Sequence, residues 1–155
     1  MKKSGTAASP WALCWDDENY YLIAYDTCAD SIKHYRVDKM DDIKVLEDER
    51  DGGKTFEKFD PADYSKGVFS MFGGEKATVK LSVDNDCIGV IVDRFGRDIF
   101  VTKESDTTFG VSVDIMTSKQ FYAWVFGLGG KVRIISPQNV VDEFKKQLEN
   151  VNGSF

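Results

Sequence analysis

The sequence has little histidine, cysteine or proline, and each shortage excludes a class of protein. Its single histidine, His34, would have to serve any Ser-His-Asp or Cys-His catalytic site, and no nucleophile motif accompanies it. Its three cysteines are odd in number and scattered, so they support neither a disulfide framework nor a zinc site. Free cysteines suit a reducing compartment. Only three prolines, beside 42% hydrophobic residues, indicate a globular chain rather than a disordered one.

Long apolar runs and an excess of positive charge are also absent. No stretch approaches the roughly 20 apolar residues that a membrane span requires, and the N-terminus does not resemble a secretory signal. We therefore expect a cytoplasmic protein without membrane contact. A net charge of −6 argues against non-specific coating of duplex DNA. No His, Cys and carboxylate residues have metal-ligand spacing, and the glycines at 127–130 indicate a helix stop rather than a phosphate loop. We expect no catalytic site, metal or cofactor.

The negative charge is concentrated in the first half of the chain. Residues 1–75 contain ten Lys or Arg and sixteen Asp or Glu, whereas residues 76–155 contain ten of each. One basic segment, residues 31–40, interrupts the acidic half. Its basic residues are Lys33, His34, Arg36 and Lys39. This segment is either a solvated strand, with Asp38 pairing to Arg36 or Lys39, or a binding site for an anion.

Alternating apolar residues and polar turns predict antiparallel strands in the first half. The predicted strands cover residues 10–15, 20–25, 31–40 and 43–46. Both faces of the second strand are apolar or amphipathic, which favours a small closed barrel. Two adjacent glycines and several charges predict a mobile loop at residues 48–58, and Asp60-Pro61 begins a short helical turn.

The pattern changes after Gly73-Gly74, where periods of 2 and 3.6 residues begin to alternate. Predicted strands cover residues 79–83, 99–102, 109–115 and 132–135, and predicted helices cover 85–95, 117–128 and 136–148. The order β-α-β-β-α-β plus a final helix is a ferredoxin-like plan with helices on one sheet face. The fold class is therefore α+β. We expect a barrel domain at residues 8–72 and a ferredoxin-like domain at residues 76–150.

The first half resembles the WYL-domain family of bacterial transcription regulators. The family's Trp-Tyr-Leu signature falls on Tyr20, Tyr21 and Leu22, with tyrosine at the first position. The family's basic third strand falls on residues 33–39, where two of its usual arginines are Lys33 and Lys39. Lysine keeps the charge but loses the bidentate fork of arginine.

The second half resembles the WYL C-terminal extension. The resemblance rests on Trp124, on Gly127-Leu128-Gly129, and on Ser136-Pro137 at the start of the last helix. It implies an SH3- or Sm-like barrel that senses a ligand, which is single-stranded nucleic acid in some members, and an extension that contributes to a homodimer. Family members read duplex DNA through a preceding helix-turn-helix. Nine residues precede Pro10, too few for such a module, so we expect the regulatory half of a longer regulator.

We expect an anionic effector, a single-stranded nucleic acid or a nucleotide, on the basic strand. The candidate ligand-binding residues are Arg36 as the main anchor, Lys39, Lys33 and His34 as further contacts, and Tyr20 and Tyr21 as stacking surfaces. Strand alternation places Lys33 and Lys39 on one face and His34 and Arg36 on the other, so twist, a bulge or a barrel rim must bring them together. One alternative is a dimerisation module without a ligand, in which the tyrosines are core residues. Another is a hydrolase on a ferredoxin-like fold.

Overall fold

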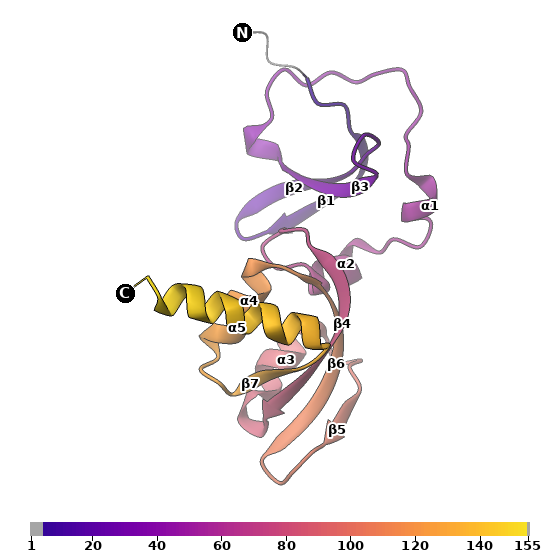
Figure 1. Cartoon of the computed structure of the whole chain (residues 1–155). Coiled ribbons are helices and arrows are strands. Elements are labelled where there is room, and N and C mark those ends of the chain that lie inside the picture. Colours follow the sequence, from indigo (N-terminus) through magenta and orange to yellow (C-terminus); the bar gives the residue numbers. More distant parts are fainter. Residues whose placement is uncertain (1–4, 155) are drawn as a thin grey trace. The chain divides into compact units, whose positions relative to one another are not determined.

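The computed structural model describes residues 5–154 and contains helices and two antiparallel sheets, an α+β fold (Figure 1). The chain divides into two compact units, Met1–Ser65 and Lys66–Phe155. The elements that begin in the first unit are β1 (Ser9–Asp16), β2 (Asn19–Asp26), β3 (Ser31–Arg36), the 3₁₀ turn η1 (Val37–Lys39), α1 (Gly53–Phe56) and α2 (Pro61–Gly67). Those of the second unit are β4 (Glu75–Asp84), η2 (Asn85–Cys87), α3 (Ile88–Phe95), β5 (Val101–Lys103), β6 (Thr108–Thr117), α4 (Lys119–Gly127), β7 (Val132–Ser136) and α5 (Gln138–Asn152). The domain limits 8–72 and 76–150 stay a prediction.

The first unit contains a three-stranded antiparallel sheet in the order β1-β2-β3. These are the first three predicted strands, and they form where aromatic and β-branched residues favour the pleated conformation. A tight turn joins β1 to β2, because Asp16 pairs directly with Asn19. The two residues between them, Asp17 and Glu18, have positive φ angles of 46° and 60°. That conformation gives a two-residue hairpin its native twist, and glycine or asparagine usually supplies it.

Two parts of the strand prediction are wrong. The third strand ends at Arg36 instead of continuing to residue 40, because the backbone turns into η1. No strand forms at residues 43–46, where Ile43 and Val45 are 71% and 96% exposed. Without a fourth strand, β1 and β3 remain the edges of an open sheet. The described part of the chain therefore contains no closed barrel.

Aromatic side chains from α1, α2 and the residues between them pack beside this sheet. The Trp11 ring of β1 stacks on Phe56 at 4.8 Å with an angle of 4° between the planes, and further ring contacts run through Phe59 to Tyr64. The prediction of a loop at residues 48–58 is thus wrong in part, since the region contains α1 and its Phe56 is buried. The segment that reads as polar and glycine-rich contributes a core residue.

The second unit contains a four-stranded antiparallel sheet in the order β5-β6-β4-β7. The predicted strands and helices of this half are all present, with shifts of a few residues at their ends. Their periodicity reflects burial: Val79, Leu81 and Val83 alternate along β4 and are fully buried. They share one core with the buried residues of β6, α3 and α4. The Ser118 side chain caps α4 by accepting a hydrogen bond from the Phe121 N–H at 3.2 Å.

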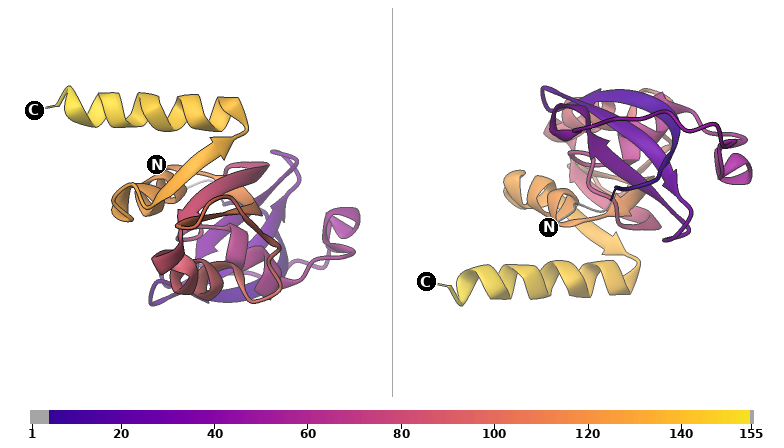
Figure 2. Two further views of the ribbon diagram at one scale, coloured as in Figure 1. Left: turned by 90° about the horizontal axis from the view of Figure 1, so that it is seen from below. Right: turned by 90° about the horizontal axis from the view of Figure 1, so that it is seen from above.

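The last helix, α5, is covered over its first half and exposed toward its end. Val140 is 2% exposed, and the Phe144 ring stacks on Tyr122 at 5.8 Å. Further along, Leu148 and Val151 are 37% and 57% exposed, and Figure 2 shows the helix running out past β7. None of the helices in residues 5–154 combines the length and the apolarity that crossing a membrane needs.

Candidate effector site on the first sheet

The register of the first sheet divides the predicted site residues between two faces. Arg36 pairs with Tyr21, and His34 lies two residues before Arg36 on the same strand, so these three side chains share one face. Lys33 and Tyr20 point to the other face. We call the first the Arg36 face and the second the Trp15 face, because Trp15 pairs directly with Tyr20. The prediction that Lys33 and Arg36 lie on opposite faces is confirmed.

Arg36 is held by two partners at one end of the sheet. Its Nε and Nη2 donate to the two carboxylate oxygens of Asp38 at 3.0 and 2.9 Å, and Nη2 also donates to Asn19 Oδ1 at 2.6 Å. The turn η1 makes this possible, because it brings Asp38 back toward the end of β3. The hydrogen bonds from Arg36 hold the pKa of Asp38 below its ordinary value. Of the two predicted partners of Asp38, Arg36 and Lys39, the structure shows Arg36.

Lys33 also has an internal counter-ion, on the opposite face. Its Nζ forms an ion pair with Asp26, which is 6% exposed and also accepts a hydrogen bond from the Ala29 N–H at 2.9 Å. The hydrogen bond from Lys33 lowers the pKa of Asp26, and the same bond raises the pKa of Lys33. Lys33 thus neutralises a nearly buried carboxylate, which gives it a structural role whether or not it contacts a ligand.

His34 connects β3 to α2. Its Nε2 lies 2.9 Å from the Tyr64 hydroxyl, and the two rings are 5.7 Å apart. Burial raises the pKa of Tyr64 to about 12. This contact ties the helical segment to the sheet.

The remaining predicted residues lie near the ends of the strands. Lys39 is exposed at the end of η1, beyond the strand on which it was predicted. Tyr21 is partly buried beside Arg36, whereas Tyr20 is 52% exposed on the other face. The Tyr20 ring meets the Trp15 ring edge-on at 4.7 Å, and Trp15 is itself 60% exposed. Trp15 was not among the predicted site residues, although its place directly before the polar turn pairs it with Tyr20.

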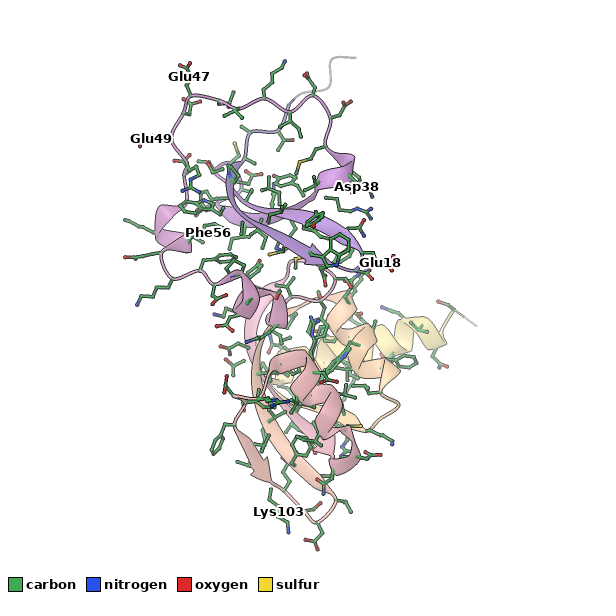
Figure 3. All side chains as sticks on the ribbon, turned by 180° about the vertical axis from the view of Figure 1, so that it is seen from behind. Glu18, Asp38, Glu47, Glu49, Phe56 and Lys103 are labelled. Atoms are coloured by element: carbon green, nitrogen blue, oxygen red, sulfur yellow. The ribbon has the colours of Figure 1, made fainter. Side chains whose placement is uncertain are left out.

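Arg36, Asn19 and Asp38 lie together at one end of the sheet. Figure 3 shows Asp38 and Glu18 at this end, and Glu47 and Glu49 on the loop away from it. The guanidinium of Arg36 and the amide of Asn19 lie together there, with the Tyr21 ring adjacent in the register. Within residues 5–154, no group of three or more His, Cys, Asp or Glu side chains is placed to hold a metal ion. Arg36 thus forms a charge-assisted, bidentate pair with Asp38 at this end of the sheet.

Comparisons with known proteins match both halves of the chain. The model of the WYL domain matches residues 2–45, which include β1, β2, β3 and η1, and the model of the WCX domain matches residues 75–151. A similar solved structure is the proteasome accessory factor B/C (PafBC) of Arthrobacter aurescens. It is 19% identical, with a TM-score of 0.43, over 92% of this chain. The chain spans 21% of the length of that protein. No curated protein matches the sequence.

Proposed function

Because the chain belongs to the WYL-domain regulator family, we propose that it is the effector-sensing and oligomerising region of a bacterial transcription regulator. The match of one family model to the first sheet and of another to residues 75–151 supports this assignment. In this proposal the chain carries no catalytic activity and works as a homodimer in the cytoplasm. It affects duplex DNA through a helix-turn-helix domain outside the sequence described.

The clamp around Arg36 is the observation that carries the ligand proposal. An anionic effector, a single-stranded nucleic acid or a nucleotide, docks at the Arg36 end of the sheet. The guanidinium offers a planar fork that fits a phosphate, Asn19 adds an amide, and the exposed Lys39 adds charge. Tyr21, on the same face as Arg36, supplies the ring for base stacking.

Asp38 acts as an internal competitor in this site. Its carboxylate occupies Nε and Nη2 of Arg36, one of the two bidentate edges that a guanidinium offers to a phosphate. Binding of an anion therefore requires that Asp38 swing away or share the guanidinium. This pairing lowers the affinity for weak anions and keeps Arg36 oriented while the site is empty.

Titration of a labelled deoxythymidine oligonucleotide of about 12 residues, near the site size of a small β-domain, tests the ligand proposal. Arg36→Ala should weaken binding and reduce the slope of log affinity against log salt by ~0.7, the loss of one phosphate contact on a single strand. Asp38→Asn should tighten binding, because it frees the guanidinium.

The matched control is Arg133→Ala, since Arg133 forms a similar pair with Asp84 at 2.9 Å in the second unit. Arg133→Ala should leave the affinity unchanged. Equal affinities for Arg36→Ala and Arg133→Ala would remove Arg36 from the site.

A dimerisation module without a ligand is the second candidate function. It is favoured by the internal partners of the basic strand: Arg36 has Asp38, Lys33 has Asp26, and His34 contacts Tyr64. If neither the wild type nor Asp38→Asn binds the oligonucleotide or a labelled nucleotide, this candidate is preferred.

We also propose a ferredoxin-like plan for the second unit. The strand order β5-β6-β4-β7 supports it, together with the helices α3 after β4 and α4 after β6. Its final helix, α5, leaves Leu148 and Val151 exposed, and these side chains are candidates for the contact between two copies of the chain.

A further inference from the structure

The Trp15 face carries exposed apolar side chains that the clamp does not use. Leu13, Trp15 and Tyr20 are 59%, 60% and 52% exposed, and they lie on one face of the β1–β2 hairpin. Trp15 and Tyr20 are directly opposite each other, and their rings touch edge-on. Single exposed apolar residues are ordinary on a protein surface, whereas a contiguous exposed apolar patch is typical of an interaction site.

The hairpin turn places negative charge directly beside these rings. Asp16, Asp17 and Glu18 follow Trp15 without interruption. Among the residues that the structure describes, no ion pair engages Asp17 or Glu18. Lys33, the cation on the same face, is already paired with Asp26. The surface next to the aromatic pair is therefore acidic.

We propose that the Trp15 face is a docking surface for a basic, arginine-bearing segment of a partner protein. A guanidinium is attracted to the face of an indole or phenol ring and to carboxylates at the rim of the contact. The arginine stem covers apolar surface at the same time, which suits Leu13. Charge complementarity favours this occupant over a nucleic acid, because Asp17 and Glu18 lie in the adjoining turn and Lys33, the cation of this face, is already paired with Asp26. The surface lies on the face opposite Arg36, so it is distinct from the effector site.

The experiment titrates a labelled oligoarginine peptide against the whole chain and follows its fluorescence anisotropy. Trp15→Ala should weaken binding roughly 5-fold, the size of a cation–π contact at an exposed site. Tyr20→Ala should weaken it in the same direction. Both side chains are more than half exposed, so these variants should fold, and far-UV circular dichroism checks that they do.

Removing charge separates a specific site from general attraction to an acidic protein. Asp17→Asn combined with Glu18→Gln should weaken peptide binding. Glu47→Gln combined with Glu49→Gln removes the same charge from the loop that Figure 3 shows away from the hairpin, and it should have a much smaller effect. Equal effects of the two double variants, or unchanged binding by Trp15→Ala, would show that the attraction is diffuse and overturn the proposal.

Two further measurements decide between occupants. Arg36→Ala should still bind the peptide, which distinguishes this surface from the effector site. Competition by a deoxythymidine oligonucleotide that is lost in Trp15→Ala would assign the face to nucleic acid instead. Sedimentation of wild type and Trp15→Ala tests the remaining occupant: a dimer that only the wild type forms would show that a second copy covers the face. Either of these results would overturn the proposal.

Discussion

Phe56→Ala is expected to remove about 3–5 kcal/mol from the free energy of unfolding of the first unit, the usual cost of deleting a buried phenyl ring. The ring is 6% exposed in α1, stacked on Trp11 and tilted against Phe59 at 4.7 Å. A phenyl group buries on the order of 150–250 Å², and at about 25 cal/mol per Å² this area corresponds to about 4–6 kcal/mol. That figure is an upper bound, because the unfolded chain already buries part of this surface.

The expected loss is large compared with the total free energy of unfolding of a unit of this size. Small domains are stabilised by about 0.05–0.15 kcal/mol per residue, which gives a unit of this length roughly 3–10 kcal/mol. Phe56 is also one of few buried apolar side chains in residues 5–65, where the others include Ile23 and Ala24. We therefore expect the variant to be largely unfolded, or to lose the contacts that hold α1 beside β1.

Urea unfolding followed by tryptophan fluorescence measures this effect, because Trp11 is in contact with the ring that is removed. Phe100→Ala is the control: Phe100 is 81% exposed, and its replacement should change the free energy by less than about 0.5 kcal/mol. A loss below about 1 kcal/mol for Phe56→Ala would refute the assignment of Phe56 to the core, since it would match an ordinary surface change.

Three further outcomes are expected. Gly74→Ala should lower the thermal midpoint, because an added Cβ would lie 1.9 Å from the backbone oxygen of Thr117, while Gly73→Ala, with nothing within 4 Å, should be nearly neutral. Lys33 holds the pKa of Asp26 below its ordinary value, so this carboxylate stabilises the fold at neutral pH, and the stabilisation is lost as the pH falls through the folded pKa. Asp26→Asn should therefore make the urea midpoint of unfolding depend less on pH in the acid range. Analytical ultracentrifugation should give the mass of a homodimer, and a monomer at high micromolar concentration would contradict that proposal.

Periodicity predicted the second half of the chain well because burial there follows a local pattern. Val79, Leu81 and Val83 alternate with polar residues along β4, and all three are fully buried. The helix α3 likewise buries Ile91 and Phe95, one turn apart. Each element shows its buried face within its own residues, so one short window is enough to predict it.

The first half was harder to predict because its contacts join distant positions. Phe56 is surrounded by glycine and charged residues in the sequence, and its burial depends on Trp11, far away along the chain. Ile43 and Val45 have high strand propensity, yet strand formation needs a partner edge, and none is present beside them in the described chain. Strand propensity is a property of single residues, whereas strand pairing depends on the other strands of the sheet.

For the candidate site, alternation correctly placed Lys33 and Arg36 on opposite faces. What it could not supply was the partner of each cation. Asp38 reaches Arg36 because the strand ends and turns at that point, and Asn19 reaches it from the first position of β2, two residues before Tyr21 on the same face. Both contacts depend on the residues at which the strands begin and end, and the ends of strands are the least reliable part of a prediction from sequence.

The hairpin turn links the two proposed surfaces, and this predicts that their ligands affect each other. Asn19 ends the turn that carries Asp17 and Glu18, and its side chain accepts the hydrogen bond from Arg36. An anion that draws the guanidinium away from Asn19 releases one support of the acidic turn beside Trp15.

The affinity for oligoarginine should then differ between the free chain and the chain saturated with oligonucleotide. Thermodynamic reciprocity requires the oligonucleotide affinity to change by the same factor when the peptide is bound. Asn19→Ala should abolish this difference while both ligands still bind, because it removes the side chain that is hydrogen-bonded both to Arg36 and to the Asp17 carbonyl. A difference that persists unchanged in Asn19→Ala would mean that the two ligands interact through charge alone.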